Sequence, residues 1–89
     1  MSPLPVDVSS NDPSMSITAT AGRVSIRGTA SDTGFLPAYV SFDVGGKKVM
    51  LRLTQGLEPE QLLAELKPRL SKKRVAVVGT AADFQLVAR

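Results

Sequence analysis

The sequence predicts an α+β fold in which one helix packs on a mostly antiparallel sheet of about six short strands, in the order ββββαββ. Three observations lead to this prediction. Apolar and polar residues alternate along four stretches within residues 16–54, a pair of glycines separates two of those stretches, and the leucines of one later segment recur with a helical period. The 89-residue length suits one small domain, predicted over residues 16–89, with an extended N-terminal arm over residues 1–15.

The first residues differ in composition from the rest of the chain. Residues 1–21 contain two of the eight acidic residues and none of the 11 basic ones, and residues 1–13 contain three of the six prolines. Because proline fixes the backbone in an extended form and excludes helix, we expect an arm that needs a surface to lie on. A neighbouring subunit would provide that surface, contacted by three apolar anchors and two carboxylates: Leu4, Val6, Val8, Asp7 and Asp12.

A first pair of strands is expected around the Ala21-Gly22 step. Apolar residues alternate with polar ones on both sides of it, over residues 16–20 and 23–27. A tight turn at the glycine would join the two stretches as a hairpin. Residues 28–37, which follow, are rich in turn formers and are expected to form a loop.

A second hairpin is indicated more strongly by Gly45-Gly46. The alternating stretches 38–44 and 47–54 flank these two glycines directly. Two-residue hairpin turns need positive φ at their central residues, which glycine adopts at no steric cost. The sequence therefore predicts two antiparallel strands joined by this turn.

The predicted helix spans residues 59–66 or a little more. Pro59 suits the first helical position, and Leu57 and Leu62 have the spacing of a hydrophobic staple. Pro68 removes a helical hydrogen bond and is expected to distort or end the helix. The apolar stripe of the helix consists of four leucines: Leu62, Leu63, Leu66 and Leu70.

Two further strands close the predicted fold. Residues 74–78 and 84–88 are rich in Val, Leu and Ala, and residues 79–83 between them are expected to form the turn. Together with the helix, these strands complete the order ββββαββ.

The composition disfavours catalysis. The chain contains no Cys and no His, which removes disulfides, thiolate metal sites, cysteine nucleophiles and the commonest general base. We therefore predict no enzyme activity, no cofactor and no metal site. The first residues lack the basic and apolar regions of a signal peptide, and no apolar run is long enough to cross a bilayer. Synthesis in the cytoplasm and no membrane partner are expected.

One motif leaves an enzymatic alternative open. Asp32-Thr33-Gly34 spells the catalytic triplet of aspartic proteases, which it resembles, and Asp32 would then share a proton with a second carboxylate. The residues around it depart from that family, because polar and small residues 29–31 precede the Asp and Phe35 follows the Gly. A turn is the favoured interpretation.

The basic residues support a second alternative, a small nucleic-acid-binding module. The net charge is +3, and all basic residues lie from Arg23 onward. Positive charge at suitable spacing can bind phosphates, although no aromatic residue is interleaved with these charges for base stacking. In the alternative interpretation, these cations are simply exposed to solvent at the hairpin tip and at the C-terminus of the helix. The candidate residues are Lys47, Lys48, Arg52, Lys72, Lys73 and Arg74.

Residues 18–89 resemble a recurrent module of phage tail, baseplate and fibre proteins and of some bacterial surface proteins. The stretches that carry the resemblance are TATAGRVSIRG, YVSFDVGGKKVMLRLTQGLEPEQLLAELKPRL and RVAVVGTAADFQLVAR. The resemblance implies a non-enzymatic structural subunit, a virion or phage-derived decoration or tail-type protein, and carries over no functional residue. With the features above, we expect a homo-oligomer, or a partner of another structural subunit, that associates through the arm and through sheet edges.

Overall fold

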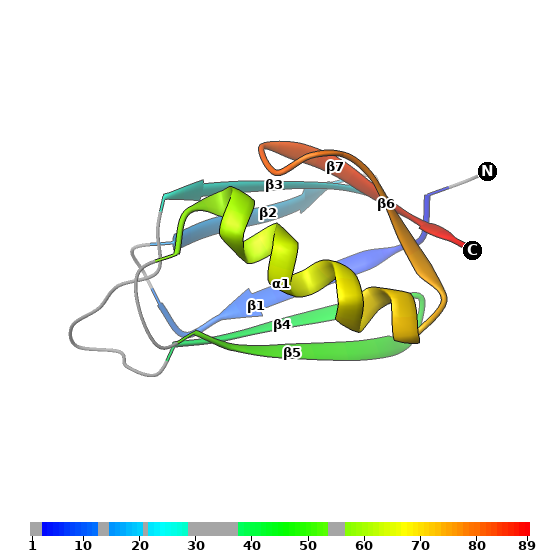
Figure 1. Ribbon diagram of the computed structural model, residues 1–89, viewed down its shortest axis with the longest axis horizontal. Helices are drawn as coiled ribbons and strands as arrows, with labels where there is room; N and C mark the ends of the chain where they lie inside the picture. The colour runs from blue at the N-terminus through cyan, green and yellow to red at the C-terminus, as the bar shows by residue number, and fades with distance from the viewer. Residues whose placement is uncertain (1–2, 13–14, 21, 29–37, 54–56) are drawn as a thin grey trace.

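A computed structural model describes residues 3–12, 15–20, 22–28, 38–53 and 57–89. Among these residues it has seven strands and one helix, which confirms the predicted α+β class and the order of elements from the second strand onward (Figure 1). The additional strand comes first. The elements are β1 Val6–Ser10, β2 Met15–Thr20, β3 Arg23–Gly28, β4 Ala38–Val44, β5 Lys47–Leu53, α1 Pro59–Lys72, β6 Val75–Thr80 and β7 Asp83–Ala88.

The strands form two antiparallel sheets, whereas the sequence predicted one. The first sheet has the order β1-β4-β5 and the second the order β2-β3-β7-β6. The predicted hairpin at Gly45-Gly46 is confirmed, since both residues have positive φ, 57° and 86°, and Val44 pairs with Lys47. The turn between β6 and β7 is shorter than predicted and consists of two residues, Ala81 and Ala82.

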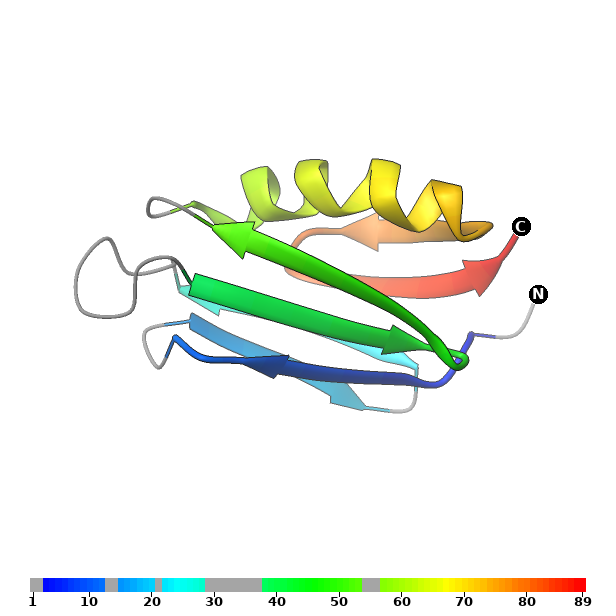
Figure 2. The same cartoon turned by 90° about the horizontal axis from the view of Figure 1, so that it is seen from below.

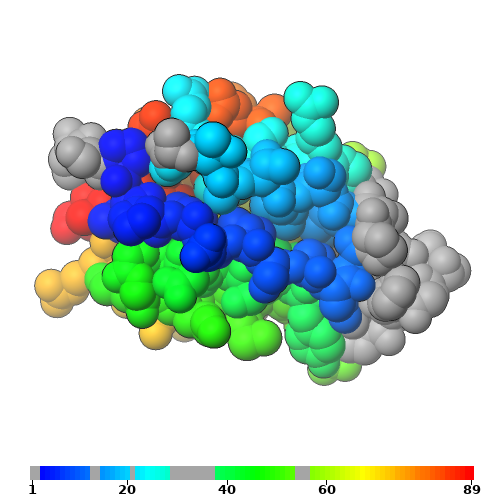
Figure 3. Space-filling model, turned by 180° about the vertical axis from the view of Figure 1, so that it is seen from behind, coloured from blue at the N-terminus to red at the C-terminus, as the bar shows by residue number. Residues whose placement is uncertain are grey.

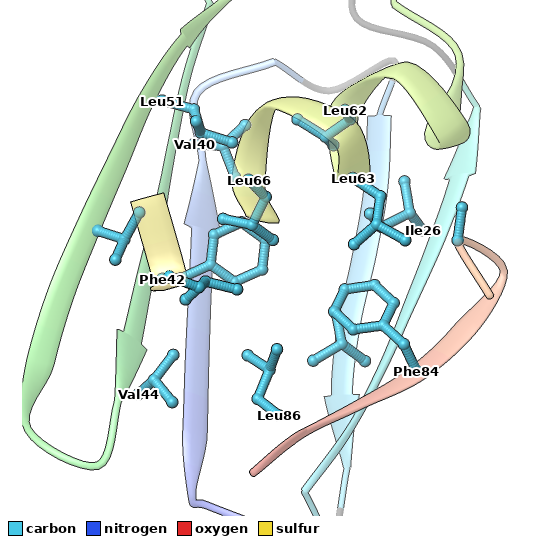
Figure 4. Close-up of a cluster of buried hydrophobic side chains, with 14 of the residues drawn as sticks. Ile26, Val40, Phe42, Val44, Leu51, Leu62, Leu63, Leu66, Phe84 and Leu86 are labelled. Carbon is cyan, nitrogen blue, oxygen red and sulfur yellow. The ribbon is translucent and has the colours of Figure 1, made fainter. Parts of the chain in front are cut away.

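The core lies between the two sheets and the helix. α1 runs along the open side between them, and its leucines point into the space that the sheets leave (Figures 2 and 4). Phe42 from the first sheet and Phe84 from the second lie at its centre among aliphatic side chains. The helix contributes the four leucines that the sequence placed on one stripe: Leu62, Leu63, Leu66 and Leu70.

The N-terminal residues are part of this fold, and the prediction of an arm outside the body is wrong. β1 pairs with β4 of its own chain along its whole length, from Val6 opposite Val44 to Ser10 opposite Val40. Leu4, Val6 and Val8 pack against the core of the same chain. Their alternation, read as the apolar side of an arm, is the inward face of a strand. Prolines are tolerated here because they lie at the start of a strand.

The residues just before β1 join the two sheets. The Gly45 N–H donates to the Pro5 carbonyl at 2.9 Å on the side of the first sheet. On the other side, the Leu4 N–H donates to the carbonyl of Leu86 in β7 at 2.7 Å. The start of the chain therefore lies between the sheets and holds them together at one end.

The helix continues past Pro68 to Lys72, so of the two effects expected at Pro68, a distortion or an end of the helix, the end is wrong. Leu70, fully buried, anchors the last turn in the core. That burial offsets the backbone hydrogen bond that Pro68 cannot make. At the other end, the Glu58 N–H donates to the Gln61 side chain at 2.9 Å, and Pro59 occupies the first turn as predicted.

Candidate functional site: two open sheet edges

Each of the two sheets has two outer strands, and two of these four strands cover one another. β1 and β2 lie side by side, as the space-filling view shows (Figure 3). The other two outer strands, β5 and β6, flank the helix on either side and contact it (Figures 1 and 2). β5 and β6 are therefore the edges that an incoming strand could reach.

The hydrogen-bond pattern shows which groups of β5 face outward. The Tyr39 carbonyl accepts from the Asn11 N–H at 3.1 Å, so the main chain of Tyr39 faces β1. Arg52, its partner in β5, consequently points its N–H and carbonyl away from β4. The same alternation gives outward main chains to Met50 and Lys48. No hydrogen bond joins these backbone groups to another part of the described chain.

On β6 the outward groups belong to Val75, Val77 and Gly79. The Arg89 N–H donates to the Arg74 carbonyl at 3.0 Å, so the main chain of Arg74 faces β7 and that of Val75 faces away. Val77 and Gly79 follow by alternation. Within the described residues, the outward N–H and carbonyl groups of these three residues likewise form no hydrogen bond with another backbone segment.

A groove of about 260 Å³ lies beside β5, between the strand and the last turns of the helix. Two of its lining residues are apolar, Val49 and Met50, and Met50 is 58% exposed. The other four are cationic: Lys48, Arg69, Lys72 and Lys73. Arg69 and Lys72 come from α1 and Lys73 is its C-cap residue, at spacings that place Lys72 and Lys73 on positions neighbouring Arg69.

Lys47 connects the two sides of this groove. Its Nζ donates to the Lys73 carbonyl at 2.9 Å, which connects the β4–β5 hairpin to the end of the helix. That carbonyl belongs to the C-cap residue, and a cation is favourable at a helix C-terminus. Lys47 therefore acts as a structural tie in this conformation.

The groove gathers half of the basic patch that the sequence suggested. Lys48, Lys72 and Lys73 line it, whereas Arg52 lies towards the other end of β5. Arg74 follows the helix with φ 60°, and its N–H donates to the Ser71 carbonyl at 3.0 Å. Sequence reasoning missed Arg69 as a site residue, although its spacing from Lys72 and Lys73, three and four positions, was the available signal.

The groove beside β6 has a different character. Its volume is about 320 Å³, and Val75, Ala76 and Val77 form the strand side. Lys67 and Ser71 of α1 and Arg89 complete the lining, and the Arg89 guanidinium donates to the Ser71 hydroxyl at 2.6 Å. The strand itself carries no charge along its six residues, VAVVGT.

The predicted arm residues do not gather on one exposed surface of this chain. Leu4, Val6 and Val8 are used in their own chain, and Asp12 is buried at 2% exposure, so it cannot face a neighbour's cations. Asp7 is exposed and lies opposite Asp43 on the outer face of the first sheet. Asp32-Thr33-Gly34 lies outside the described residues.

One ion pair ties the second sheet together. The Arg23 guanidinium donates to both carboxylate oxygens of Asp83, at 2.6 and 3.1 Å. These hydrogen bonds hold the pKa of Asp83 below its ordinary value, with the positive charge of Arg23 adding to the effect, and they raise the pKa of Arg23. The pair joins β3 to β7, which share a short register.

The described residues hold no group of three or more His, Cys, Asp or Glu placed to bind a metal ion, and no helix among them is long and apolar enough to cross a membrane. Comparisons with family models, curated proteins and solved structures found no match to this chain. The geometry of the two edges therefore carries the functional argument.

Proposed function

We propose that this protein is a non-enzymatic assembly module that associates with its own copies by pairing β6 strands edge to edge. The observation that carries the proposal is the open, uncharged edge of β6. Proteins usually protect such edges with Lys, Pro, bulges or a covering segment. An edge left without these features favours addition of another strand.

A twofold axis at Val77 would use all three outward residues. Val77 would pair with Val77 of the second copy, and Val75 with Gly79, giving about six main-chain hydrogen bonds. The second sheet of each copy would then continue into that of the other. Identical surfaces meet in such a dimer, so the absence of charge on β6 avoids like-charge repulsion.

The exposure of Val78 also supports this pairing. It is 55% exposed on the outer face of the sheet, and in this pairing it would lie opposite Ala76 of the second copy. The contact is short, so we expect a weak association, with a dissociation constant of about 10–100 µM.

Solution mass measured against concentration tests this proposal. The monomer mass is 9.4 kDa, and we expect the mass from light scattering to rise towards twice that value as concentration increases. Val77→Pro removes the outward N–H at the centre of the edge and should keep the protein monomeric. Val77→Ala is the matched control, because it shortens the same side chain but keeps the N–H. Wild-type protein that stays monomeric at millimolar concentration would refute the proposal.

Nucleic-acid binding is a second candidate function, favoured by the gathering of Lys48, Arg69, Lys72 and Lys73 around one groove. It predicts binding of a single-stranded or duplex oligonucleotide that weakens steeply as salt increases. No binding at about 20 mM salt would remove it. A place in a virion or phage-derived tail stays a prediction from the sequence resemblance.

A further inference from the structure

We propose that the groove between β5 and α1 binds an acidic, extended segment of another protein, which adds to the first sheet as a strand beside β5. This site is separate from the β6 edge and goes beyond the proposed self-association. Four features support it: free backbone groups, a fixed wall, concentrated positive charge and an exposed apolar side chain.

The free backbone groups form a regular row. Lys48, Met50 and Arg52 direct their N–H and carbonyl groups away from β4, at every second residue. An extended peptide can satisfy such a row with main-chain hydrogen bonds whatever its side chains are. The row thus gives affinity for an extended chain, and the side chains around it set which chain is bound.

The groove is formed before a ligand arrives. The Gly45-Gly46 turn sets the register of the hairpin, and the Lys47 ammonium bonded to the Lys73 carbonyl joins the hairpin to the helix end. A site whose walls are already connected loses less conformational entropy when it binds.

The charge of the groove selects an acidic occupant. Lys48, Arg69, Lys72 and Lys73 surround it, and it is lined by no carboxylate of the described residues. The nearest acidic position across the hairpin is Asp43, whose carboxylate accepts from the Gly46 N–H at 3.1 Å. Charge complementarity of this kind orients the partner and disfavours wrong ones. A second copy of β5 is one such wrong partner, since Lys48 and Arg52 would repel it.

The exposed apolar side chain of the groove favours a ligand in which apolar residues alternate with acidic ones. Met50 is the exposed apolar side chain beside the cations, and its flexible thioether chain can adapt to different apolar side chains, whereas Val49 is buried in the core. A strand that alternates acidic and apolar residues would place both types suitably. A peptide is favoured over a nucleic acid because the row of backbone groups matches a peptide main chain, whereas no aromatic side chain lines the groove to stack on bases.

Fluorescence anisotropy with a labelled peptide tests the inference. The probe alternates Glu and Val over seven residues, the length of β5, and its charge-reversed control alternates Lys and Val. We expect the acidic probe to bind and the basic one not to bind. Increasing the salt from about 50 to about 500 mM should weaken binding about tenfold.

Two kinds of variant separate the contributions of backbone and charge. Met50→Pro removes an outward N–H and should weaken binding at least about tenfold, whereas Met50→Ala, which keeps that N–H, should lose much less. Lys72→Glu combined with Lys73→Glu should weaken binding by a similar factor through charge alone. Val77→Pro, on the other edge, should leave peptide binding unchanged.

Several results would overturn the inference. No binding of the acidic probe, equal loss in Met50→Ala and Met50→Pro, or loss in Val77→Pro would each exclude strand addition at β5. An oligonucleotide that binds more tightly than the acidic peptide and competes with it would assign the groove to nucleic acid instead. Because self-association is measured by mass and involves β6, failure here leaves that proposal standing, and the reverse also holds.

Discussion

β5 and β6 occupy equivalent places on the two sides of one helix, yet their sequences differ in charge. β5, KKVMLRL, presents Lys48 and Arg52 on its exposed face, whereas β6, VAVVGT, has no charged residue. A charged edge repels its own copy and attracts an acidic strand, and an uncharged edge can meet itself. This difference in charge favours a different partner at each of the two open edges of one small domain.

The covered edges extend this comparison. β1 and β2 lie against one another, and β1 and the residues before it bring the apolar side chains of Leu4, Val6 and Val8 to the core. Edges closed in this way need no protective charge. Among the described strands, the two open edges therefore both lie on the side of the molecule that carries the helix (Figure 2).

The largest effect is expected when β1 is removed and a covered part of the first sheet becomes open. Deleting residues 1–14 would take away β1 and expose β4, whose Phe42 and Val40 are fully buried. We expect a loss of more than about 4 kcal/mol in the free energy of unfolding, or an insoluble product. Urea unfolding measures it, with Asp7→Asn in the full chain as the control. A deleted protein that unfolds like the full chain would restore the interpretation of this segment as an arm.

Removing the charge of β5 should make the two edges alike. In Lys48→Val combined with Arg52→Val, we expect self-association to strengthen about tenfold, because the repulsion that prevents β5 from pairing with its copy is gone. Sedimentation equilibrium measures the change. Arg27→Val in β3, a loss of charge away from both open edges, is the control. If the double variant associates no more than the wild type, charge does not protect this edge.

A smaller effect is expected from the tie between β5 and the helix. Lys47→Met keeps most of the side-chain length but removes the ammonium that donates to the Lys73 carbonyl. Since this hydrogen bond is exposed, we expect a loss of about 0.5–1 kcal/mol in the free energy of unfolding. Peptide binding at β5 should weaken with it, whereas the solution mass should not change. An unchanged peptide affinity would show that the groove does not depend on this tie.

The smallest effect concerns Asp83 and Arg23 in the sheet that contains β6. The pKa of Asp83 is lower in the folded protein than its ordinary value of about 3.9, so its contribution to stability is present above that pH. The contribution is lost as the pH falls through the lower, folded-state pKa. Both side chains are more than half exposed, so the effect should be slight. We expect Asp83→Asn to remove this part of the acid dependence of thermal unfolding; identical pH profiles would contradict it.

Local signals in the sequence predicted much of the fold. Gly45-Gly46 between alternating stretches indicated the β4–β5 hairpin, and the leucine spacing indicated the buried face of α1. The fate of residues 3–12 and of Pro68 depended on tertiary packing, which composition does not reveal. Prolines and missing positive charge suggested an arm, but the alternation of Leu4, Val6 and Val8 was the better guide.

The candidate site was predictable only in part. The sequence indicated that Lys48, Lys72 and Lys73 could act together, because the hairpin and the helix end are both basic. It could not show that they meet across one groove, since that depends on how the helix crosses the sheets. The openness of β6 was equally hidden, because strand order decides which strand lies at an edge.

Amide hydrogen exchange, followed by NMR, tests the central claim most directly. The account predicts that the outward N–H groups of Val75, Val77 and Gly79 become protected as protein concentration rises, while those of Lys48, Met50 and Arg52 continue to exchange rapidly. Adding the peptide of alternating Glu and Val should then protect the β5 groups and leave β6 as it was. Protection of both edges by concentration alone, or of neither edge under either condition, would contradict the account.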